Sequence, residues 1–183
     1  GRWAFVENTP FRRFKHFNHE GGIASPLIAH WPKGISAKNE LRTQPGHLID
    51  IMATCVDVTG ATYPKEFKGH AILPMEGRSL VPVLENSAAK LPDRYQFTHQ
   101  GRWPKLGDPN EAKFKVAAVR TTRWALVSEN GGREPSWQLF DLSVNYSQKN
   151  NVLAQHPDVV KELSAAFDKW WSECLPLMVN EKA

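Results

Sequence analysis

The stretch Ala112–Glu129, AKFKVAAVRTTRWALVSE, decides the fold class of this chain. It is rich in β-branched and aromatic residues, which favour strands. The segments YQFTHQ (95–100) and SWQLFDL (136–142) have the same character, and the second alternates apolar with polar residues. Together they predict three or four antiparallel strands joined by glycine-rich turns. Asn130-Gly131-Gly132 is expected to form one of the hairpin turns.

The segment that follows the strands, HPDVVKELSAAFDKWWSECL, has the pattern of an amphipathic helix. Pro157 suits the first helical position, and Asp158 complements the positive end of the helix dipole. The apolar face that packs on the sheet is expected to contain Val160, Leu163, Phe167, Trp170 and Cys174.

The first half of the chain gives weaker signals. Residues 1–25 read as a loop, and PLIAHWP (26–32) reads as a short buried strand between prolines. HLIDIMATCVDVTG has apolar residues at roughly helical spacing, which predicts a helix over about 47–59 that ends at Gly60. A second, short helix is expected near Leu80–Leu84, within an otherwise irregular, proline-rich connection.

The composition is that of a globular protein of one domain or two small lobes. The 183 residues are 41% hydrophobic and 23% charged, with a net charge of +4. The cations are scattered among acids, so a nucleic-acid surface is not expected. No apolar run has the length of a membrane span. Cys55 and Cys174 are interpreted as buried free thiols, so they do not identify the compartment.

The segment RFKHFNHEGG (13–22) combines four potential cations, one carboxylate and two adjacent glycines. A lysine ammonium such as Lys15 suits a tetrahedral oxyanion, and Gly21-Gly22 would allow positive φ and a close approach to a ligand. A zinc-protease helix needs His-Glu-x-x-His, whereas the order here is His-x-x-His-Glu and the glycines would stop a helix. By composition alone, a solvated loop remains the alternative to an anion site.

A second candidate is the segment THQGRW, in which His99 leaves a strand into a glycine turn beside Arg102. This arrangement is common at pocket rims, but a surface turn fits the composition equally well. The sequence has no Gly-x-Ser-x-Gly elbow and no phosphate-binding glycine loop, and neither cysteine has a recognisable catalytic context. Motifs alone therefore identify no nucleophile.

Taken in order, several segments resemble the C-terminal part of the sulfatase (arylsulfatase) family. Lys15 and Glu20-Gly21-Gly22, followed by IASPLIAHWP, are similar to the family's Lys-x4-Glu-Gly-Gly segment and the Trp-Pro that follows it. HLIDIMATCVDVTGATYP looks like its Asp-Ile-x-Pro-Thr helix, and GRSLVPVL like its Gly-x-Ser-Leu-x-Pro-x-Leu. WALV, WQLFDL and NNVLAQHPDVVKEL resemble its closing strands and last helix. The resemblance extends over nearly all 183 residues.

The resemblance implies an α/β (α+β) fold, with the tail of an alkaline-phosphatase-like sulfatase domain followed by a small antiparallel sheet packed on a C-terminal helix. Residues 1–90 would finish the catalytic α/β domain and residues 91–183 would form the small subdomain. The family hydrolyses sulfate esters with a formylglycine nucleophile and a bound calcium ion. In this resemblance Lys15 contacts the sulfate, and His99, Arg102 and His19 are substrate-binding candidates, His19 in a supporting position.

The sequence departs from the family in its catalytic half. No Cys/Ser-x-Pro/Ala-x-Arg occurs, because CVDVT and CLPLM both lack the arginine. The family's aspartate-rich calcium ligands are also missing, so neither formylglycine nor a metal site is expected in this chain. Ala53 precedes Thr54 where the family has proline.

The first hypothesis is therefore a C-terminal fragment of a sulfatase, a sulfuric ester hydrolase that is inactive as this chain alone. The alternative is a degenerate sulfatase-like module that binds sulfated carbohydrate or a protein partner without catalysis. As a fragment, the chain should expose an apolar face near residues 26–32 and 47–59, and either self-associate or bind the missing N-terminal half. The family implies a periplasmic or secreted location.

Overall fold

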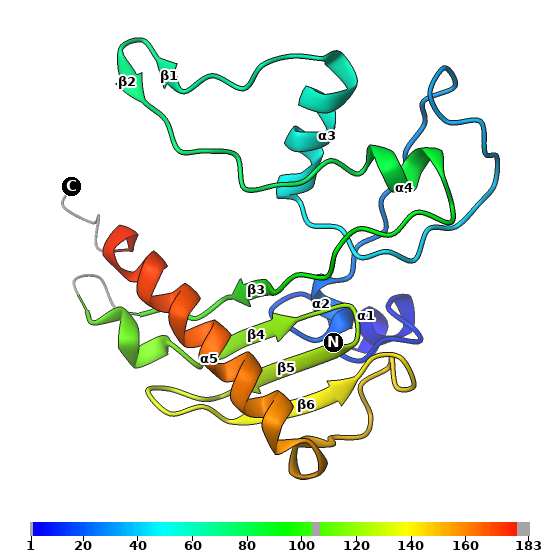
Figure 1. Ribbon diagram of the computed structural model, residues 1–183. Coiled ribbons are helices and arrows are strands. Elements are labelled where there is room, and N and C mark those ends of the chain that lie inside the picture. Colours follow the sequence, from blue (N-terminus) through cyan, green and yellow to red (C-terminus); the bar gives the residue numbers. More distant parts are fainter. Residues whose placement is uncertain (1, 104–106, 179–183) are drawn as a thin grey trace. The chain divides into compact units, whose positions relative to one another are not determined.

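The computed structural model describes residues 2–103 and 107–178. The chain divides into two compact units (Figure 1). Unit 1 comprises residues 1–26 and 93–183, and unit 2 comprises residues 27–92. The helices and strands of unit 1 are α1 (Arg2–Glu7), α2 (Glu20–Ile23), β3 (Gln96–His99), η1 (Pro109–Ala112), β4 (Val116–Arg120), β5 (Trp124–Glu129), β6 (Trp137–Asp141), η2 (Leu153–Gln155), α5 (Pro157–Cys174) and η3 (Leu175–Leu177). Those of unit 2 are α3 (Ile49–Thr59), β1 (Glu66–Phe67), β2 (His70–Ala71) and α4 (Val81–Glu85).

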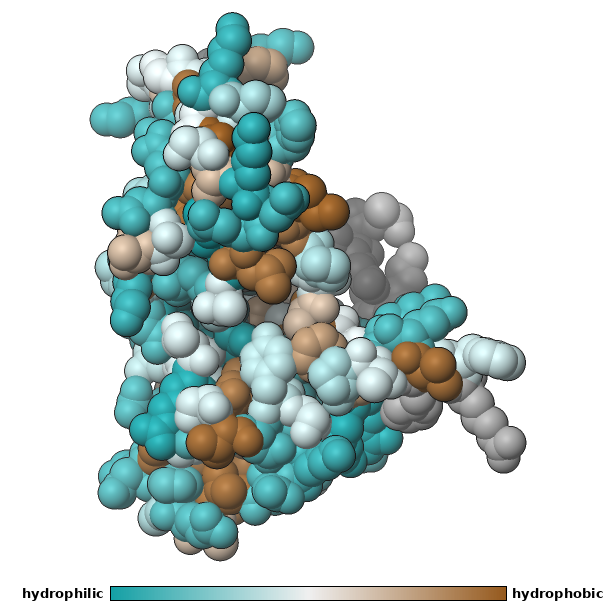
Figure 2. Space-filling model, turned by 90° about the vertical axis from the view of Figure 1, so that its right-hand side faces the viewer, coloured by the Kyte–Doolittle hydropathy of each residue, from teal (hydrophilic) through white to brown (hydrophobic). Residues whose placement is uncertain are grey.

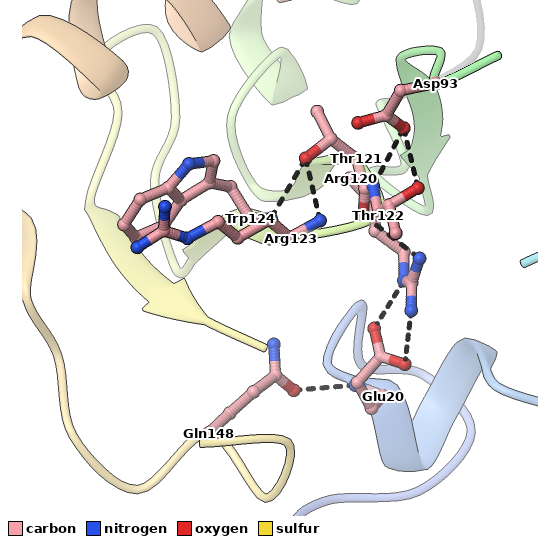
Figure 3. Close-up of polar contacts among 8 residues, drawn as sticks. All are labelled: Glu20, Asp93, Arg120, Thr121, Thr122, Arg123, Trp124 and Gln148. Atoms are coloured by element: carbon pink, nitrogen blue, oxygen red, sulfur yellow. Dashed lines mark hydrogen bonds and ion pairs between the residues drawn. The ribbon is translucent and has the colours of Figure 1, made fainter. Parts of the chain in front are cut away.

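The predicted antiparallel sheet forms the centre of unit 1. Its four strands follow the order β3-β4-β5-β6, and each strand pairs antiparallel with the next along the chain. The predicted hairpin turn lies between β5 and β6, where Asn130 has a φ of 58°. At the turn between β4 and β5, the Asp93 carboxylate accepts hydrogen bonds from the backbone N–H and the hydroxyl of Thr122, both at 2.9 Å (Figure 3).

Helix α5 covers one face of this sheet, as the amphipathic pattern predicts (Figure 1). Leu163, Phe167 and Trp171 lie one turn apart and are the buried residues of the helix. Trp171, and not the predicted Trp170, is therefore the third fully buried residue. Trp170 instead stacks on Phe97 of β3 with ring centroids 5.1 Å apart. The core cluster beneath the helix consists of Phe114, Ala117, Val119, Leu126, Leu139, Leu163, Phe167 and Trp171.

The opposite face of the sheet carries a second cluster and receives the N-terminal segment. Because side chains alternate along a strand, the residues next to those under α5 point the other way. That second cluster consists of Ala118, Ala125, Val127, Phe140 and Leu142. Arg120 and Glu129 lie on the same face, and both contact residues of the segment 8–24. The sheet thus lies between α5 and the N-terminal segment.

The N-terminal segment is not the plain loop expected from the sequence. Residues 2–7 form α1, and the single turn α2 contains Gly21 and Gly22. No helix extends over residues 16–19, where a zinc-protease helix would need one. The two glycines lie inside the single turn α2, which ends directly after them at Ile23. The segment is also part of unit 1, whereas the sequence grouped it with residues up to 90. The expected boundary near residue 90 lies close to the change of unit at residue 93, and the assignment of residues 1–90 to a catalytic domain stays a prediction.

Unit 2 is built around α3, whose predicted end at Gly60 is confirmed by a left-handed C-cap with a φ of 64°. Asp50 is fully buried and accepts hydrogen bonds from the backbone N–H groups of His47 (2.8 Å) and Arg78 (3.1 Å). The Thr54 hydroxyl accepts a further hydrogen bond, from the Leu80 N–H at 2.9 Å. These bonds connect α3 to the GRSL segment that leads into α4.

Two predictions for unit 2 were wrong. Residues 26–32 form no strand, and Leu27 and Ile28 are 61% and 90% exposed. Cys55 is exposed on α3 rather than buried, and Cys174 is half-buried; both are free thiols. The apolar residues of this region are thus largely open to solvent, and Figure 2 shows exposed hydrophobic residues in brown on the face in view.

Across the described residues, no helix combines the length and apolarity that a membrane crossing needs.

Candidate functional site

Lys15 lies at an exposed turn on the N-terminal segment. The Phe17 N–H donates to the Phe14 carbonyl at 3.1 Å, so Lys15 and His16 are the two central residues of a β-turn. His16 has a φ of 80°, as the third residue of a type II turn does. Among the residues that the structure describes, the Lys15 ammonium makes no hydrogen bond or ion pair. A free ammonium on a turn of fixed geometry is suited to hold an anion.

Gly21 and Gly22 lie directly beneath the Lys15 segment. The sequence predicted that they would take positive φ and let a ligand approach, but the structure gives them a different role. Neither glycine has a positive φ. A side chain on Gly22 would collide with the carbonyl oxygens of Phe14 and Phe17, and one on Gly21 with those of Arg12 and Arg13. The glycines therefore let the Lys15 turn lie directly on α2, rather than letting a ligand approach the backbone.

Glu20, the residue before the glycines, forms a buried bidentate ion pair with Arg120 of β4 (Figure 3). The Arg120 Nε donates to Oε1 at 2.8 Å and Nη2 to Oε2 at 3.3 Å. Burial is the largest single influence and disfavours the charged guanidinium. The hydrogen bonds and the negative charge of Glu20, with a smaller contribution from Tyr146, together outweigh it, so the pKa of Arg120 lies above its ordinary value. Planar bidentate pairs of this kind fix geometry as well as charge.

Gln148, from the loop after β6, binds the same segment at two points. Its buried side-chain Oε1 accepts a hydrogen bond from the Glu20 N–H at 2.7 Å (Figure 3). Its backbone carbonyl accepts one from Arg12 Nη1, also at 2.7 Å. The start of α2 and the residues before the Lys15 turn are therefore held by one residue of the C-terminal half.

Glu129, at the end of β5, faces two further residues of the segment. Arg13 Nη2 donates to Oε2 at 3.1 Å, and the His19 Nδ1 lies 3.0 Å from Oε1 without the geometry of a hydrogen bond. Burial, with the nearby Arg13 and Arg12, lowers the pKa of His19 from 6.5 to about 4. His19 is therefore neutral at physiological pH, and its contact with Glu129 is not an ion pair.

His19 was expected to contact substrate, and its burial does not fit that role. The side chain is 2% exposed and its ring lies 5.6 Å from that of Phe140. The residue belongs to the interior between the segment and the sheet. We assign it a packing role.

Asn18 joins the Lys15 segment to the strand that carries the second predicted site. Its buried side-chain amide donates to the carbonyls of Thr98 (3.0 Å) and Val116 (3.1 Å). The end of β3, where His99 lies, is thus tied to the segment that carries Lys15. This hydrogen bonding is what brings the two sequence candidates into one region of unit 1.

His99 itself is half-buried against α5. Its Nε2 lies 2.9 Å from the Ala112 carbonyl, and its ring meets Trp171 edge-on at 4.8 Å. Burial lowers the pKa of His99, and the hydrogen bond to Ala112 opposes that shift. The contacts described for this histidine are structural, and a role in substrate binding stays a prediction.

Arg102 is exposed and follows Gly101, just after the end of β3. Within the described part of the chain its side chain makes no hydrogen bond or ion pair. Among the described residues of unit 1, neither Lys15 nor Arg102 has a hydrogen-bond or ion-pair partner for its side chain, whereas His19 and His99 are held in packing contacts. The roles of Lys15 and Arg102 toward substrate also stay predictions.

The sequence interpretation missed the residues that hold the Lys15 segment in place, namely Arg120, Glu129 and Gln148. A signal was present for two of them. Arg120 and Glu129 end apolar strands and share a face with Ala118 and Val127. A charged residue on the core face of a strand needs a buried partner. Gln148 offered no comparable signal.

The described residues do not fit a metal site. Within residues 2–103 and 107–178, no three His, Cys, Asp or Glu side chains gather as ligands would. A hollow of about 510 Å³ in unit 2, lined in part by Tyr63, Ile72 and Met75, contains none of the candidate residues.

A comparison with known families decides the identity of the fold. Residues 11–172 match the family described as "N-sulphoglucosamine sulphohydrolase, C-terminal". The chain belongs to this sulfatase family. The match includes Lys15, the Glu-Gly-Gly segment, the sheet and nearly all of α5. It also confirms the resemblance drawn from the ordered sequence landmarks.

Curated sulfatases are similar over most of the chain. A sulfatase of Formosa agariphila is 25% identical over 153 residues, which is 83% of this chain and 27% of that protein. An uncharacterized sulfatase of Schizosaccharomyces pombe is 26% identical, over 88% of this chain and 27% of its own length. An N-acetylgalactosamine-6-O-sulfatase of Bacteroides thetaiotaomicron is also 26% identical, over 86% and 29%. The chain thus spans little more than a quarter of the sulfatases it matches.

Solved structures show the same fold. The crystal structure of Ps i-CgsB superposes with a TM-score of 0.63 at 22% identity, and covers 88% of this chain and 32% of the other. The predicted fold class, the tail of an alkaline-phosphatase-like sulfatase domain with a small antiparallel sheet and a C-terminal helix, is confirmed.

Proposed function

We propose that this chain forms the C-terminal part of a sulfatase that acts on sulfated carbohydrate, and that Lys15 contacts the sulfate group. The observation that carries the proposal is the family match over residues 11–172, within which Lys15 lies on an anchored turn and its ammonium has no partner in the described part of the chain. The family description and one relative name amino-sugar sulfates, which supports this substrate class.

The chemistry of Lys15 follows from its charge. A sulfate ester gains negative charge on the bridging oxygen as the bond to sulfur breaks. An ammonium placed at that oxygen, or at the sulfate oxygens, stabilises the developing charge more than the ground state. Arg102, an exposed cation near the end of β3, would bind an anionic group on the leaving part of the substrate.

Sulfatase chemistry also uses a formylglycine hydrate as nucleophile and a calcium ion that polarises the sulfate. The residues described here provide neither the Cys/Ser-x-Pro/Ala-x-Arg motif nor a group of metal ligands. We therefore assign both to a part of the polypeptide outside these 183 residues. What this chain contributes is the binding and orientation of the sulfate.

The apolar surface of unit 2 supports the proposal that a further part of the polypeptide packs against it. On and beside α3, Ile51 is 42% exposed, Met52 58% and Leu48 78%. Contiguous exposed apolar residues mark a surface that another element covers. In the intact sulfatase we expect these residues to be buried against the rest of the catalytic α/β domain.

Two measurements test the proposed function. The isolated chain should not hydrolyse an aryl sulfate, and formylglycine-dependent turnover by it would contradict the fragment hypothesis. The coding sequence upstream of Gly1 should contain a Cys/Ser-x-Pro/Ala-x-Arg and an Asp-Asn/His-Gly. If it contains neither, the chain is better described as the non-catalytic module, for which calorimetry should then show firm binding of sulfated sugars.

In the longer sulfatase, Lys15→Ala should lower kcat/KM for a sulfate ester by about a hundredfold, the effect of removing one donor to a developing anion. Lys15→Arg should retain part of the activity because it keeps the charge. Lys149→Ala removes an exposed cation of the same unit and should leave kcat/KM unchanged. Equal effects of the Lys15 and Lys149 substitutions would rule out a specific sulfate contact.

A further inference from the structure

The position of the Lys15 turn depends on residues more than a hundred positions away in the sequence. The turn lies on α2, with Gly22 against the carbonyl groups of Phe14 and Phe17, and with Gly21 against those of the two residues before the turn. Helix α2 has only four residues, which is too few to be stable by itself. Its position must therefore come from the contacts that bind it to the sheet.

Those contacts converge on one residue, Glu20, which begins α2. Its side chain accepts hydrogen bonds from Nε and Nη2 of Arg120, and its backbone N–H donates to the Gln148 side chain. Glu20 and Gln148 are 1% exposed and Arg120 is 8% exposed, so water does not replace these bonds. A buried carboxylate that lost its guanidinium partner would not remain in this position, because the unpaired charge is too costly.

From these contacts we infer that Glu20, Arg120 and Gln148 are positioning residues for the sulfate contact. They fix α2 on the sheet, the adjacent glycines fix the turn on α2, and the turn presents the Lys15 ammonium. The Lys-x4-Glu-Gly-Gly spacing then has a physical meaning, in which the glutamate anchors, the glycines support and the lysine binds. The inference rests on the proposed function for the role of Lys15, but not for the geometry of the support.

The experiment uses the 183-residue chain and two independent readouts. Amide hydrogen exchange of residues 14–23 reports how firmly the turn and α2 are held, with the amides of β5 and α5 as internal reference. The NMR signal of ¹³C-dimethylated Lys15, assigned with Lys15→Arg, reports the response of this one ammonium to inorganic sulfate. The first readout tests the support, and the second tests the sulfate contact.

Arg120→Leu and Gln148→Met remove the two anchors in turn, and Gln148→Met keeps the variant testable if Arg120→Leu fails to fold. In Arg120→Leu, exchange over residues 14–23 should become faster by about a hundredfold, with a much smaller change in β5 and α5. The Lys15 response to sulfate should be lost in Arg120→Leu and weakened in Gln148→Met. Arg120→Lys keeps the charge and should rescue part of both readouts.

Arg123→Gln is the matched control. Arg123 lies in the same hairpin, but its partner is Asp141 and its side chain is 58% exposed. Arg123→Gln should therefore leave both the hydrogen exchange of residues 14–23 and the Lys15 response to sulfate unchanged. Unaltered exchange over residues 14–23 in both anchor variants, or an equal increase throughout the sheet and α5, would overturn the inference. If exchange rises selectively but Lys15 in the unmodified sequence never responds to sulfate, the support stands and the proposed sulfate contact fails.

Discussion

Units 1 and 2 differ in how far their apolar side chains are buried within the unit. In unit 1 the sheet is covered on one face by α5 and on the other by the N-terminal segment, so large residues such as Phe167 and Phe140 are buried. In unit 2 the buried apolar residues are only Ala53, Leu80 and Val83 among the residues described. The side chains of α3 are mostly exposed. Unit 1 therefore contains a core of its own, whereas unit 2 depends mainly on hydrogen bonds made by Asp50 and Thr54.

The largest expected difference between the units is the effect of removing one large apolar side chain. Phe167→Ala should lower the free energy of unfolding by about 3–5 kcal/mol, because it leaves a cavity in a closed core. Met52→Ala, at a residue 58% exposed, should change it by less than about 0.5 kcal/mol. Urea unfolding followed by tryptophan fluorescence measures both. Similar effects of the two substitutions would show that unit 1 has no independent core.

The second prediction concerns pH and is confined to unit 1. The pKa of His19 is about 4 in the folded chain and 6.5 when unfolded, so the unfolded state binds more protons between these values. The contribution of His19 to the free energy of unfolding should be fully present above pH 6.5. It should be lost as the pH falls toward 4, which lowers the free energy of unfolding by about 3 kcal/mol. Denaturant unfolding at a series of pH values measures this loss. His19→Gln should flatten the slope in that window, and an unchanged slope would assign the loss to other groups.

Two glycines offer a smaller contrast. Gly22→Ala places a methyl group against the carbonyl oxygens of Phe14 and Phe17, so it should cost about 1–3 kcal/mol of stability. Gly60→Ala meets no atom within 4 Å and is disfavoured only by its left-handed backbone, at about 1 kcal/mol. Thermal unfolding of the two variants, with hydrogen exchange to locate the loss, separates the causes. A larger loss of stability in Gly60→Ala than in Gly22→Ala would show that the left-handed backbone costs more than the crowding at Gly22.

A substitution on the exposed face of α3 should have the smallest effect on stability and the largest effect on self-association. Ile51 is 42% exposed on α3, so Ile51→Glu should change the free energy of unfolding by less than about 0.5 kcal/mol. If the exposed face of unit 2 drives self-association of the isolated chain, the same substitution should shift sedimentation toward the monomer. Val144→Glu, at a residue of unit 1 that is 84% exposed, gives a comparison outside this face. Equal effects on sedimentation would exclude a specific role for α3.

The parts of the fold that the sequence predicts are those whose pattern is local. The strands of the sheet and α5 follow from periodicity and capping, and each buries its apolar face against an element of the same unit. PLIAHWP has the composition of a buried strand, but Leu27 and Ile28 are exposed because none of the described elements covers them. Trp170 and Trp171 are adjacent on α5, and both are compatible with a helical face that contains Leu163 and Phe167. The contact with the sheet decides which of them is fully buried.

The candidate site depends even more on contacts between distant parts of the sequence, which local patterns do not predict. The spacing of Lys15 and Glu20 could be read from the sequence through resemblance to a family. The reason for the spacing could not, since it depends on Arg120, Glu129 and Gln148, which only the folded sheet brings to the segment. The burial of His19 is likewise a tertiary property. A histidine between Asn18 and Glu20, in a polar segment, looks exposed until the face of the sheet opposite it is known.

The hydrogen bonds of Asn18 to Thr98 and Val116 have a consequence for the order of folding. They join residues 80 and 98 positions apart, and unit 2 lies between them in the sequence. The β4–β5 and β5–β6 hairpins close over a few residues, whereas this contact must close a long loop at a larger entropic cost. We therefore expect the sheet and α5 to form first and the Lys15 segment to dock last. The cation proposed to bind sulfate would then be the final part of unit 1 to become ordered during folding.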